Sequence, residues 1–219
     1  MNRQSSSRAD PAAVSRPLMF VRHGATQPNL DGLRCGGDVD LPMTELGRVQ
    51  ITAAALQMRA SGCRVDLIVA SDLLRTRDSA RIVSEVFGGV PIEIDAAWRE
   101  RTLGRWNLRP VAETEHALRA GQTPPGGESR AEFEIRIRQV AQRLLSQPSA
   151  RLPLLVGSKG VARVLRELLG VRNAAPVGNG GVLRLDLAPL IGSPAIAEAP
   201  ACCPPRGPHL NNSLPEVAL

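Results

Sequence analysis

The sequence predicts a single α/β domain in which helices cover both faces of a mostly parallel central sheet, giving three layers. Short apolar runs alternate along the chain with segments of helical periodicity. Because successive parallel strands are joined by right-handed crossovers, helices are expected on both sides of the sheet. A length of 219 residues and a hydrophobic content of 43% are sufficient for one domain-sized core.

The first predicted strand is the apolar run 18–21, which ends at Arg22-His23-Gly24. Thr44 is a suitable N-cap for a helix that runs to Arg59, with Leu46, Val49, Ala53 and Leu56 on one face. The remaining elements are expected in chain order as strand 67–70, helix 73–87, strand 92–94, an irregular insertion over 95–130, a helix marked by Phe133, Ile137, Val140 and Leu144, strand 154–156, helix 161–169 and strand 182–185.

Three regions are predicted along the chain. Residues 1–17 lack a continuous apolar core and are expected to be a disordered leader. Residues 18–190 are expected to form the folded domain. Residues 191–219 are rich in proline, which cannot sustain a helix or a central strand, so a disordered tail is expected there.

The turn Arg22-His23-Gly24 has the chemistry of a phosphoryl-binding site. Arginine offers a planar fork for phosphate oxygens, a neutral histidine can act as a covalent nucleophile, and glycine allows a backbone N–H to approach an anion closely. In an open α/β sheet ligands bind beyond the carboxyl ends of the strands. The turns 71–75 and 157–160 follow two other predicted strands, so all three turns are expected at one edge of the sheet.

Four motifs over residues 18–187 resemble those of the histidine phosphatase superfamily, the phosphoglycerate-mutase-like proteins. After Arg22-His23-Gly24, the first motif continues with Asn29, Gly37, Asp40, Pro42, Thr44 and Gly47. The second is Ser71-Asp72-Leu73-Leu74-Arg75-Thr76, the third Glu100-Arg101-Thr102-Leu103-Gly104-Arg105-Trp106, and the fourth Pro125-Gly126-Gly127-Glu128-Ser129.

The resemblance implies phosphoryl transfer through a phosphohistidine. His23 would be the nucleophile, Arg22 and Arg75 would hold the non-bridging oxygens, and Glu100 would be the acid and base. The positions implied for substrate binding are Gly24, Asn29, Ser158, Lys159 and Glu128. Simpler structural explanations are a core histidine for His23, ion pairs for Arg22, Arg75 and Glu100, and a Gly-rich surface turn for Glu128.

One position departs from the family pattern. The second catalytic histidine of the family follows the fourth strand, where this chain has Gly157-Ser158-Lys159-Gly160. Ser158 stands where that imidazole is expected, and neither His116 nor His209 is placed to substitute for it. Three hypotheses therefore remain: an impaired or specialised phosphatase or phosphoryl-transfer enzyme, a pseudophosphatase that binds a phosphorylated metabolite or a protein partner, and different chemistry in the same anion pocket.

The amino-acid composition limits the kinds of molecule that the protein is expected to bind. The net charge of +6 is carried almost wholly by scattered arginines, with Lys159 the only lysine, and aromatic residues are too few for a nucleic-acid platform. We therefore expect a small phosphorylated substrate and no nucleic acid. No apolar run is long enough for a membrane span, and the cysteine spacing predicts neither disulfides nor a metal site, so a cytoplasmic protein without cofactor is expected. The sequence leaves the oligomeric state open between monomer and homodimer.

Overall fold

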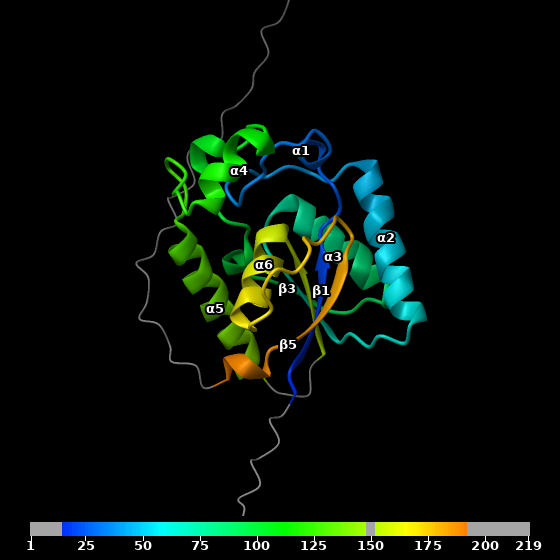
Figure 1. Ribbon diagram of the computed structural model, residues 1–219. Helices are drawn as coiled ribbons and strands as arrows, with labels where there is room; N and C mark the ends of the chain where they lie inside the picture. The colour runs from blue at the N-terminus through cyan, green and yellow to red at the C-terminus, as the bar shows by residue number, and fades with distance from the viewer. Residues whose placement is uncertain (1–14, 148–151, 192–219) are drawn as a thin grey trace, which may run out of the picture.

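A five-stranded sheet with the order β3-β2-β4-β1-β5 forms the centre of the molecule (Figure 1). The computed structural model describes residues 15–147 and 152–191, so residues 1–14 of the expected leader and 192–219 of the expected tail lie outside the described residues. The strands are β1 (Pro17–Arg22), β2 (Leu67–Ala70), β3 (Ile92–Ile94), β4 (Pro153–Gly157) and β5 (Val182–Asp186). All neighbouring pairs are parallel except β1 and β5, which are antiparallel.

Helices cover both faces of the sheet, with α2 and α3 on one side and α5 and α6 on the other (Figure 1). The helices are α1 (Gln27–Leu30), α2 (Glu45–Ala60), α3 (Leu74–Val86), α4 (Val111–Arg119), α5 (Arg130–Ser146) and α6 (Lys159–Leu168), with short 3-10 turns η1 (Ala96–Trp98), η2 (Gly104–Trp106) and η3 (Ala188–Leu190). The predicted three-layer architecture is confirmed. Within the described residues, no helix has the length and apolar character needed to cross a membrane.

Alternation along the strands divides the core in two. Leu18 and Phe20 of β1 pack in the cluster formed with α5 and α6, whereas Val21 packs in the cluster formed with α2 and α3. Because successive strand side chains point to opposite faces, one buried strand can serve both helical layers. Helices therefore cover both faces of the sheet, and the part of the sheet left open is the edge formed by the carboxyl ends of its strands.

The prediction of which face of α2 is buried is wrong. Leu46, Val49 and Leu56 are each at least half exposed. The residues that face the sheet are Gly47, Ile51, Ala54, Ala55 and Met58. Several of these are small, so α2 packs close to the chain beneath it and its buried side cannot be recognised from large apolar residues alone.

One other prediction needs correction in detail. The insertion is less irregular than expected, because it contains α4 and two 3-10 turns. The antiparallel strand of the mostly parallel sheet is β5, because the loop after α6 carries the chain to the carboxyl end of β1, where Gly180 N donates to Arg22 O, before β5 begins.

The strand register brings the predicted site turns together. Arg22 at the end of β1 pairs with Gly157 at the end of β4, and Val156 of β4 pairs with Ala70 at the end of β2. These three parallel strands are adjacent in the sheet. Their carboxyl ends therefore form one continuous edge, as the sequence predicts.

Candidate active site

His23 is held at the end of β1 by three hydrogen bonds. Its backbone N–H donates to Gly157 O over 2.9 Å, and its carbonyl accepts from Asn179 Nδ2 over 3.0 Å. Its ring Nδ1 lies 2.8 Å from Gly24 O. Because a carbonyl can only accept, Nδ1 must carry the proton. In a neutral ring this leaves a lone pair on Nε2, the atom suited to nucleophilic attack.

The environment of His23 favours the neutral ring. Its pKa lies well below the usual 6.5, chiefly because burial disfavours the charged form, and next because the positive charges of Arg75 and Arg22 repel a second cation. The hydrogen bond to Gly24 O acts in the opposite direction and does not overcome them. A buried imidazole near two guanidinium groups is therefore available as a base or nucleophile at neutral pH.

Arg75 is buried, and its Nη1 donates to Val39 O and its Nη2 to Gly36 O. Arg22 donates from Nη1 to Val177 O, which joins β1 to the loop after α6. The Nε atom of each arginine is buried and has no hydrogen-bond partner within residues 15–147 and 152–191. Two unpaired cationic donors beside a neutral imidazole form a site that an anion would complete.

Gly24 has a different role from the anion contact that the sequence suggests. Its N–H points to Ser79 Oγ at 3.3 Å and so is not free for an anion. A side chain on Gly24 would clash with the backbone of Gly47 and the sulfur of Met43. Glycine is required here by the close packing of β1 against α2.

Glu100 is fixed against the first turn of α6. Gly160 N donates to Glu100 Oε2 over 2.7 Å, and Arg101 N donates to Glu100 Oε1 over 2.8 Å. A side chain on Gly160 would overlap the Glu100 carboxylate. The glycine in the turn after β4 thus allows this acid to reach the edge of the sheet near His23 and Arg22.

The structure does not bring Glu128 to the pocket. Its carboxylate forms an ion pair with Arg136, with contacts of 2.9 Å from Nε and 2.7 Å from Nη2. Arg136 also donates to the carbonyls of Ala97 and Arg99, just before Glu100. Because the Glu128 carboxylate is paired with Arg136, Glu128 helps to position the segment that carries Glu100.

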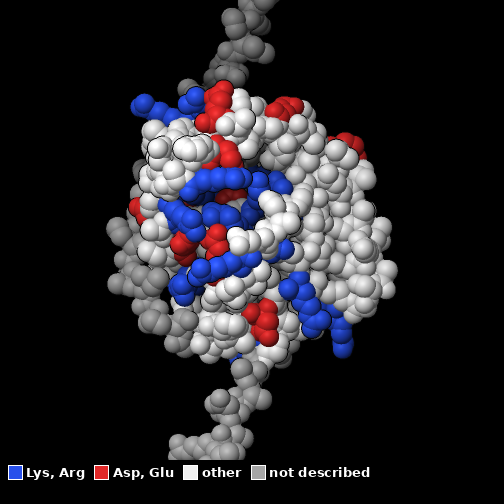
Figure 2. All heavy atoms as spheres, viewed as in Figure 1, with Lys and Arg blue, Asp and Glu red and all other residues white. Residues whose placement is uncertain are grey.

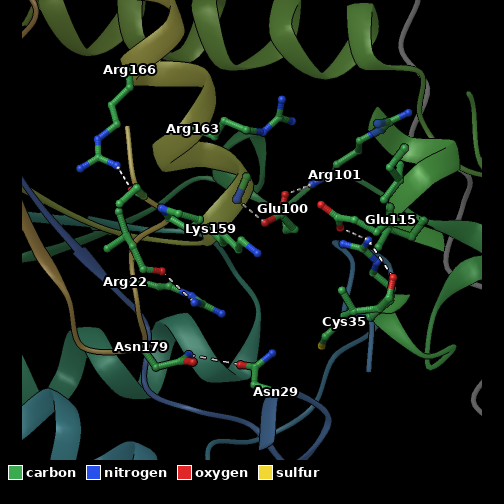
Figure 3. A pocket seen from close by; sticks show the side chains of 18 of the residues that line it. Arg22, Asn29, Cys35, Glu100, Arg101, Glu115, Lys159, Arg163, Arg166 and Asn179 are labelled. Atoms are coloured by element: carbon green, nitrogen blue, oxygen red, sulfur yellow. Dashed lines mark hydrogen bonds and ion pairs between the residues drawn. The ribbon is translucent and has the colours of Figure 1, made fainter. Parts of the chain in front are cut away.

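Ser158 and Lys159 lie where α6 begins. Ser158 is the N-cap, yet its Oγ makes no capping bond and is buried without a partner in the part of the chain that the structure describes. Lys159 is exposed to the pocket and has no ion pair or hydrogen bond among the described residues. Figure 3 shows its side chain between Arg22 and Glu100. The helix start therefore offers one hydroxyl, one ammonium group and its positive dipole end.

A pocket of about 720 Å³ is bordered by Arg22, His23, Glu100 and Lys159, whereas Arg75 and Ser158 are not among its lining residues. Eight Lys and Arg side chains but only three Glu side chains line it. Figure 2 shows the basic side chains gathered round a hollow on this face of the molecule. Asn29 also lines the pocket: its Oδ1 accepts from Thr26 N and Asn179 Nδ2, and its Nδ2 has no acceptor among the residues described. His116 is not among the lining residues.

Sequence reasoning missed part of this wall. Asn179, from the loop before β5, contacts both the His23 carbonyl and Asn29, and no motif marked it. Arg163 lies one turn beyond Lys159 on α6, so helical spacing could have indicated it. Cys35 lines the pocket with a thiol whose pKa is raised, mainly by burial. Figure 3 shows how these residues surround the space in front of Arg22 and Glu100.

Comparison with known proteins identifies the family. The model of the histidine phosphatase superfamily, branch 1, matches residues 18–189. This chain belongs to that superfamily. A glucosyl-3-phosphoglycerate phosphatase of Mycolicibacterium vanbaalenii is 33% identical over 77% of this chain and 79% of its own length. The fructose-2,6-bisphosphatase TIGAR of Xenopus tropicalis is 31% identical over 70% of this chain and 60% of its own.

Solved structures agree with this membership. A mycobacterial glucosyl-3-phosphoglycerate phosphatase in complex with VO3 has a TM-score of 0.66 and 31% identity to this chain, covering 77% of it and 90% of that protein. The relatives named here are phosphatases, and membership of their superfamily identifies this chain as an enzyme.

Proposed function

We propose that this histidine phosphatase superfamily member hydrolyses a small phosphomonoester through a phosphohistidine on His23. The observation that carries the proposal is the state of the ring: Nδ1–H donates to Gly24 O and the pKa is depressed, so Nε2 keeps its lone pair at neutral pH. Arg22 and Arg75 lie close enough for their charges to lower the pKa of His23, and each has a buried Nε without a partner among the described residues. A structural core histidine would not need two arginines nearby, of which Arg75 is buried and Arg22 partly buried.

The reaction then follows from the positions of the groups. Nε2 of His23 attacks phosphorus as the bond to the leaving oxygen breaks, and Glu100 gives that oxygen a proton. Water next attacks the phosphohistidine while the Glu100 carboxylate takes its proton, the P–N bond breaks, and phosphate leaves. Arg22 and Arg75 hold the non-bridging oxygens through both steps. Asn29 Nδ2 offers a further neutral donor.

The start of α6 is where the proposed catalytic site lacks a group. We propose that Ser158 occupies the place of the second catalytic histidine, so one charge-assisted donor to the transferring group is missing. Loss of such a donor costs about 10² to 10³ in rate. The free Lys159 ammonium supplies some of the charge, but a point charge on a flexible stem does not reproduce the geometry of an imidazole.

The substrate proposed is a small phosphorylated metabolite. The names of the relatives support this class, since one is a phosphatase of glucosyl-3-phosphoglycerate and another a fructose-2,6-bisphosphatase. The second candidate function is either binding of a phosphorylated metabolite or protein partner by a pseudophosphatase, or different chemistry in the same anion pocket. The observation that favours it is Ser158, with its buried, unpaired hydroxyl.

The test is phosphate release from a panel of phosphorylated metabolites and p-nitrophenyl phosphate. Wild type should release phosphate from at least one of them, and His23→Ala should release none while its circular dichroism spectrum is unchanged. The exposed arginine on α3 offers a matched control, and Arg81→Gln should retain wild-type turnover. Turnover by His23→Ala equal to wild type would overturn the nucleophile, whereas binding without turnover by wild type would favour the pseudophosphatase.

A further inference from the structure

The outer face of α2 carries an apolar stripe that the described residues leave uncovered. Leu46, Val49 and Leu56 are 50%, 58% and 54% exposed, and Ala53 between them is exposed as well. Within residues 15–147 and 152–191, nine large hydrophobic side chains are exposed, and three of them lie on this one helix. Figure 1 shows α2 on the outside of the molecule, and Figure 2 shows a largely uncharged surface there. Such clustering is typical of an association surface, whereas singly scattered apolar residues are not.

The spacing of the stripe is that of a seam between two paired helices. Its four residues, Leu46, Val49, Ala53 and Leu56, are separated by three, four and three positions, which is the pattern of the a and d positions of a heptad. The residues that pack α2 onto its own domain, such as Ile51 and Met58, lie on the other side of the helix. The helix therefore has two apolar sides, one packed within its own domain and one with the spacing to meet another helix.

Opposite charges flank the two ends of this seam. Glu45 directly precedes Leu46, and Arg59 lies at the other end of the helix; both are exposed, and neither has an ion pair among the described residues. Arg59 donates from Nη1 to Val86 O over 2.7 Å, a contact with a neutral carbonyl that leaves its charge unpaired. When two such helices lie antiparallel, the acidic start of each one comes beside the basic end of the other. The charges are therefore complementary to a second copy of the same helix.

We propose that α2 packs antiparallel against α2 of a second copy of this chain, about a two-fold axis, to form a homodimer. In this register Leu46 faces Leu56 of the second copy, Val49 faces its Ala53, and Glu45 lies beside its Arg59. Each contact occurs twice, because a two-fold interface uses the same surface on both subunits. The antiparallel direction also opposes the two helix dipoles, whereas a parallel pair would bring like charges to the same level of the seam.

The size of the seam sets the strength expected of the dimer. A helix of 16 residues is about 24 Å long and about 10 Å wide. One helix face is therefore smaller than the roughly 800 Å² that each partner buries in a standard interface. We expect a reversible dimer with a Kd on the order of 10 μM, in the class of small, transient interfaces. None of the seam residues lines the catalytic pocket, so the dimer is independent of the proposed function.

Sedimentation equilibrium on the full chain, from about 1 to about 100 μM, tests the dimer. The mass of wild type should rise with concentration from 23.4 kDa toward twice that value. Leu56→Glu should weaken the dimer about tenfold or more, because it buries a carboxylate against Leu46 of the second copy. Ile94→Glu is the matched control, since Ile94 is 47% exposed at the end of β3, and it should leave the equilibrium unchanged. A monomer at every concentration, or a dimer that Ile94→Glu dissociates and Leu56→Glu does not, would overturn the proposal.

Charge reversal tests the antiparallel register. Glu45→Arg alone, or Arg59→Glu alone, places like charges together at both ends of the seam and should raise Kd about tenfold, because the two-fold axis doubles each change. The double variant should restore a Kd close to that of wild type, and circular dichroism should show equal helix content in all four proteins. A dimer that neither single reversal weakens, or a double variant no tighter than the single ones, would overturn the pairing of Glu45 with Arg59 and with it this register.

Discussion

Gly160 and Glu100 occupy complementary space: the Gly160 amide donates to Glu100 Oε2 over 2.7 Å, and the carboxylate fills the volume that a side chain at 160 would need. The turn after β4 and the segment after η1 are far apart in sequence, yet each is shaped by the other. The first prediction follows from this contact.

Gly160→Ala should lower kcat by about 10², because a methyl group displaces the acid by the order of 1 Å. Steady-state kinetics on the best substrate of the panel would measure the loss. Gly178→Ala is the matched control, since nothing lies within 4 Å of a side chain added there. Equal kcat values for the two variants would show that the placement of Glu100 does not limit the reaction.

The depressed pKa of His23 predicts how stability depends on pH. Between the lowered folded pKa and 6.5 the unfolded chain binds more protons than the folded one, so stability falls as pH drops through this window and is flat above it. The His23 contribution changes by up to about 1.4 kcal/mol per pH unit. Urea unfolding from about pH 7.5 to about pH 5 should therefore show a steeper loss for wild type than for His23→Ala. Parallel curves would contradict the depressed pKa.

Arg75 should govern affinity for simple anions. Millimolar phosphate or vanadate should raise the Tm of wild type by mass action, and Arg75→Ala should remove most of that rise. Because Arg75 also holds the carbonyls of Gly36 and Val39, Arg75→Lys serves as a second variant that retains the charge. It should keep part of the Tm shift. A full shift in Arg75→Ala would exclude this arginine from the anion site.

Ser158 tests the effect of the family departure. Ser158→His should raise kcat on small phosphomonoesters by up to about 10² to 10³, with little change in KM, because the added donor acts in the transition state. Ser158→Ala controls for the loss of the buried hydroxyl and should not raise kcat. If wild type is inactive on every ester and Ser158→His restores nothing, the binding or altered-chemistry hypothesis takes precedence.

Much of the fold and the centre of the site could be predicted from sequence, because both depend on short-range signals. The apolar run ending at His23 marks a buried strand, and parallel strands bring their carboxyl ends together. The buried side of α2 could not be predicted in the same way. Small residues lie on that side because the helix approaches its neighbours closely, as Gly47 approaches Gly24 and Ala25. Larger residues of α2, such as Leu56, face solvent.

Side-chain roles that depend on tertiary partners were also beyond the sequence. The contacts of Arg136 with the carbonyls of Ala97 and Arg99 require α5 to pack against the insertion, and nothing local marks them. The contact of Asn179 with the His23 carbonyl depends on the return of β5 beside β1. Residue type indicates what a group can do, and packing decides which neighbour it meets.

Trapping of the phosphoenzyme is the most direct test of catalysis by His23. Wild type mixed with substrate and quenched in alkali, where phosphohistidine survives, should gain the mass of one phosphoryl group, and peptide mapping should place it on His23. His23→Ala should gain none under the same conditions. Phosphorylation of another residue, or substrate turnover by His23→Ala at the wild-type rate, would contradict a reaction through this histidine.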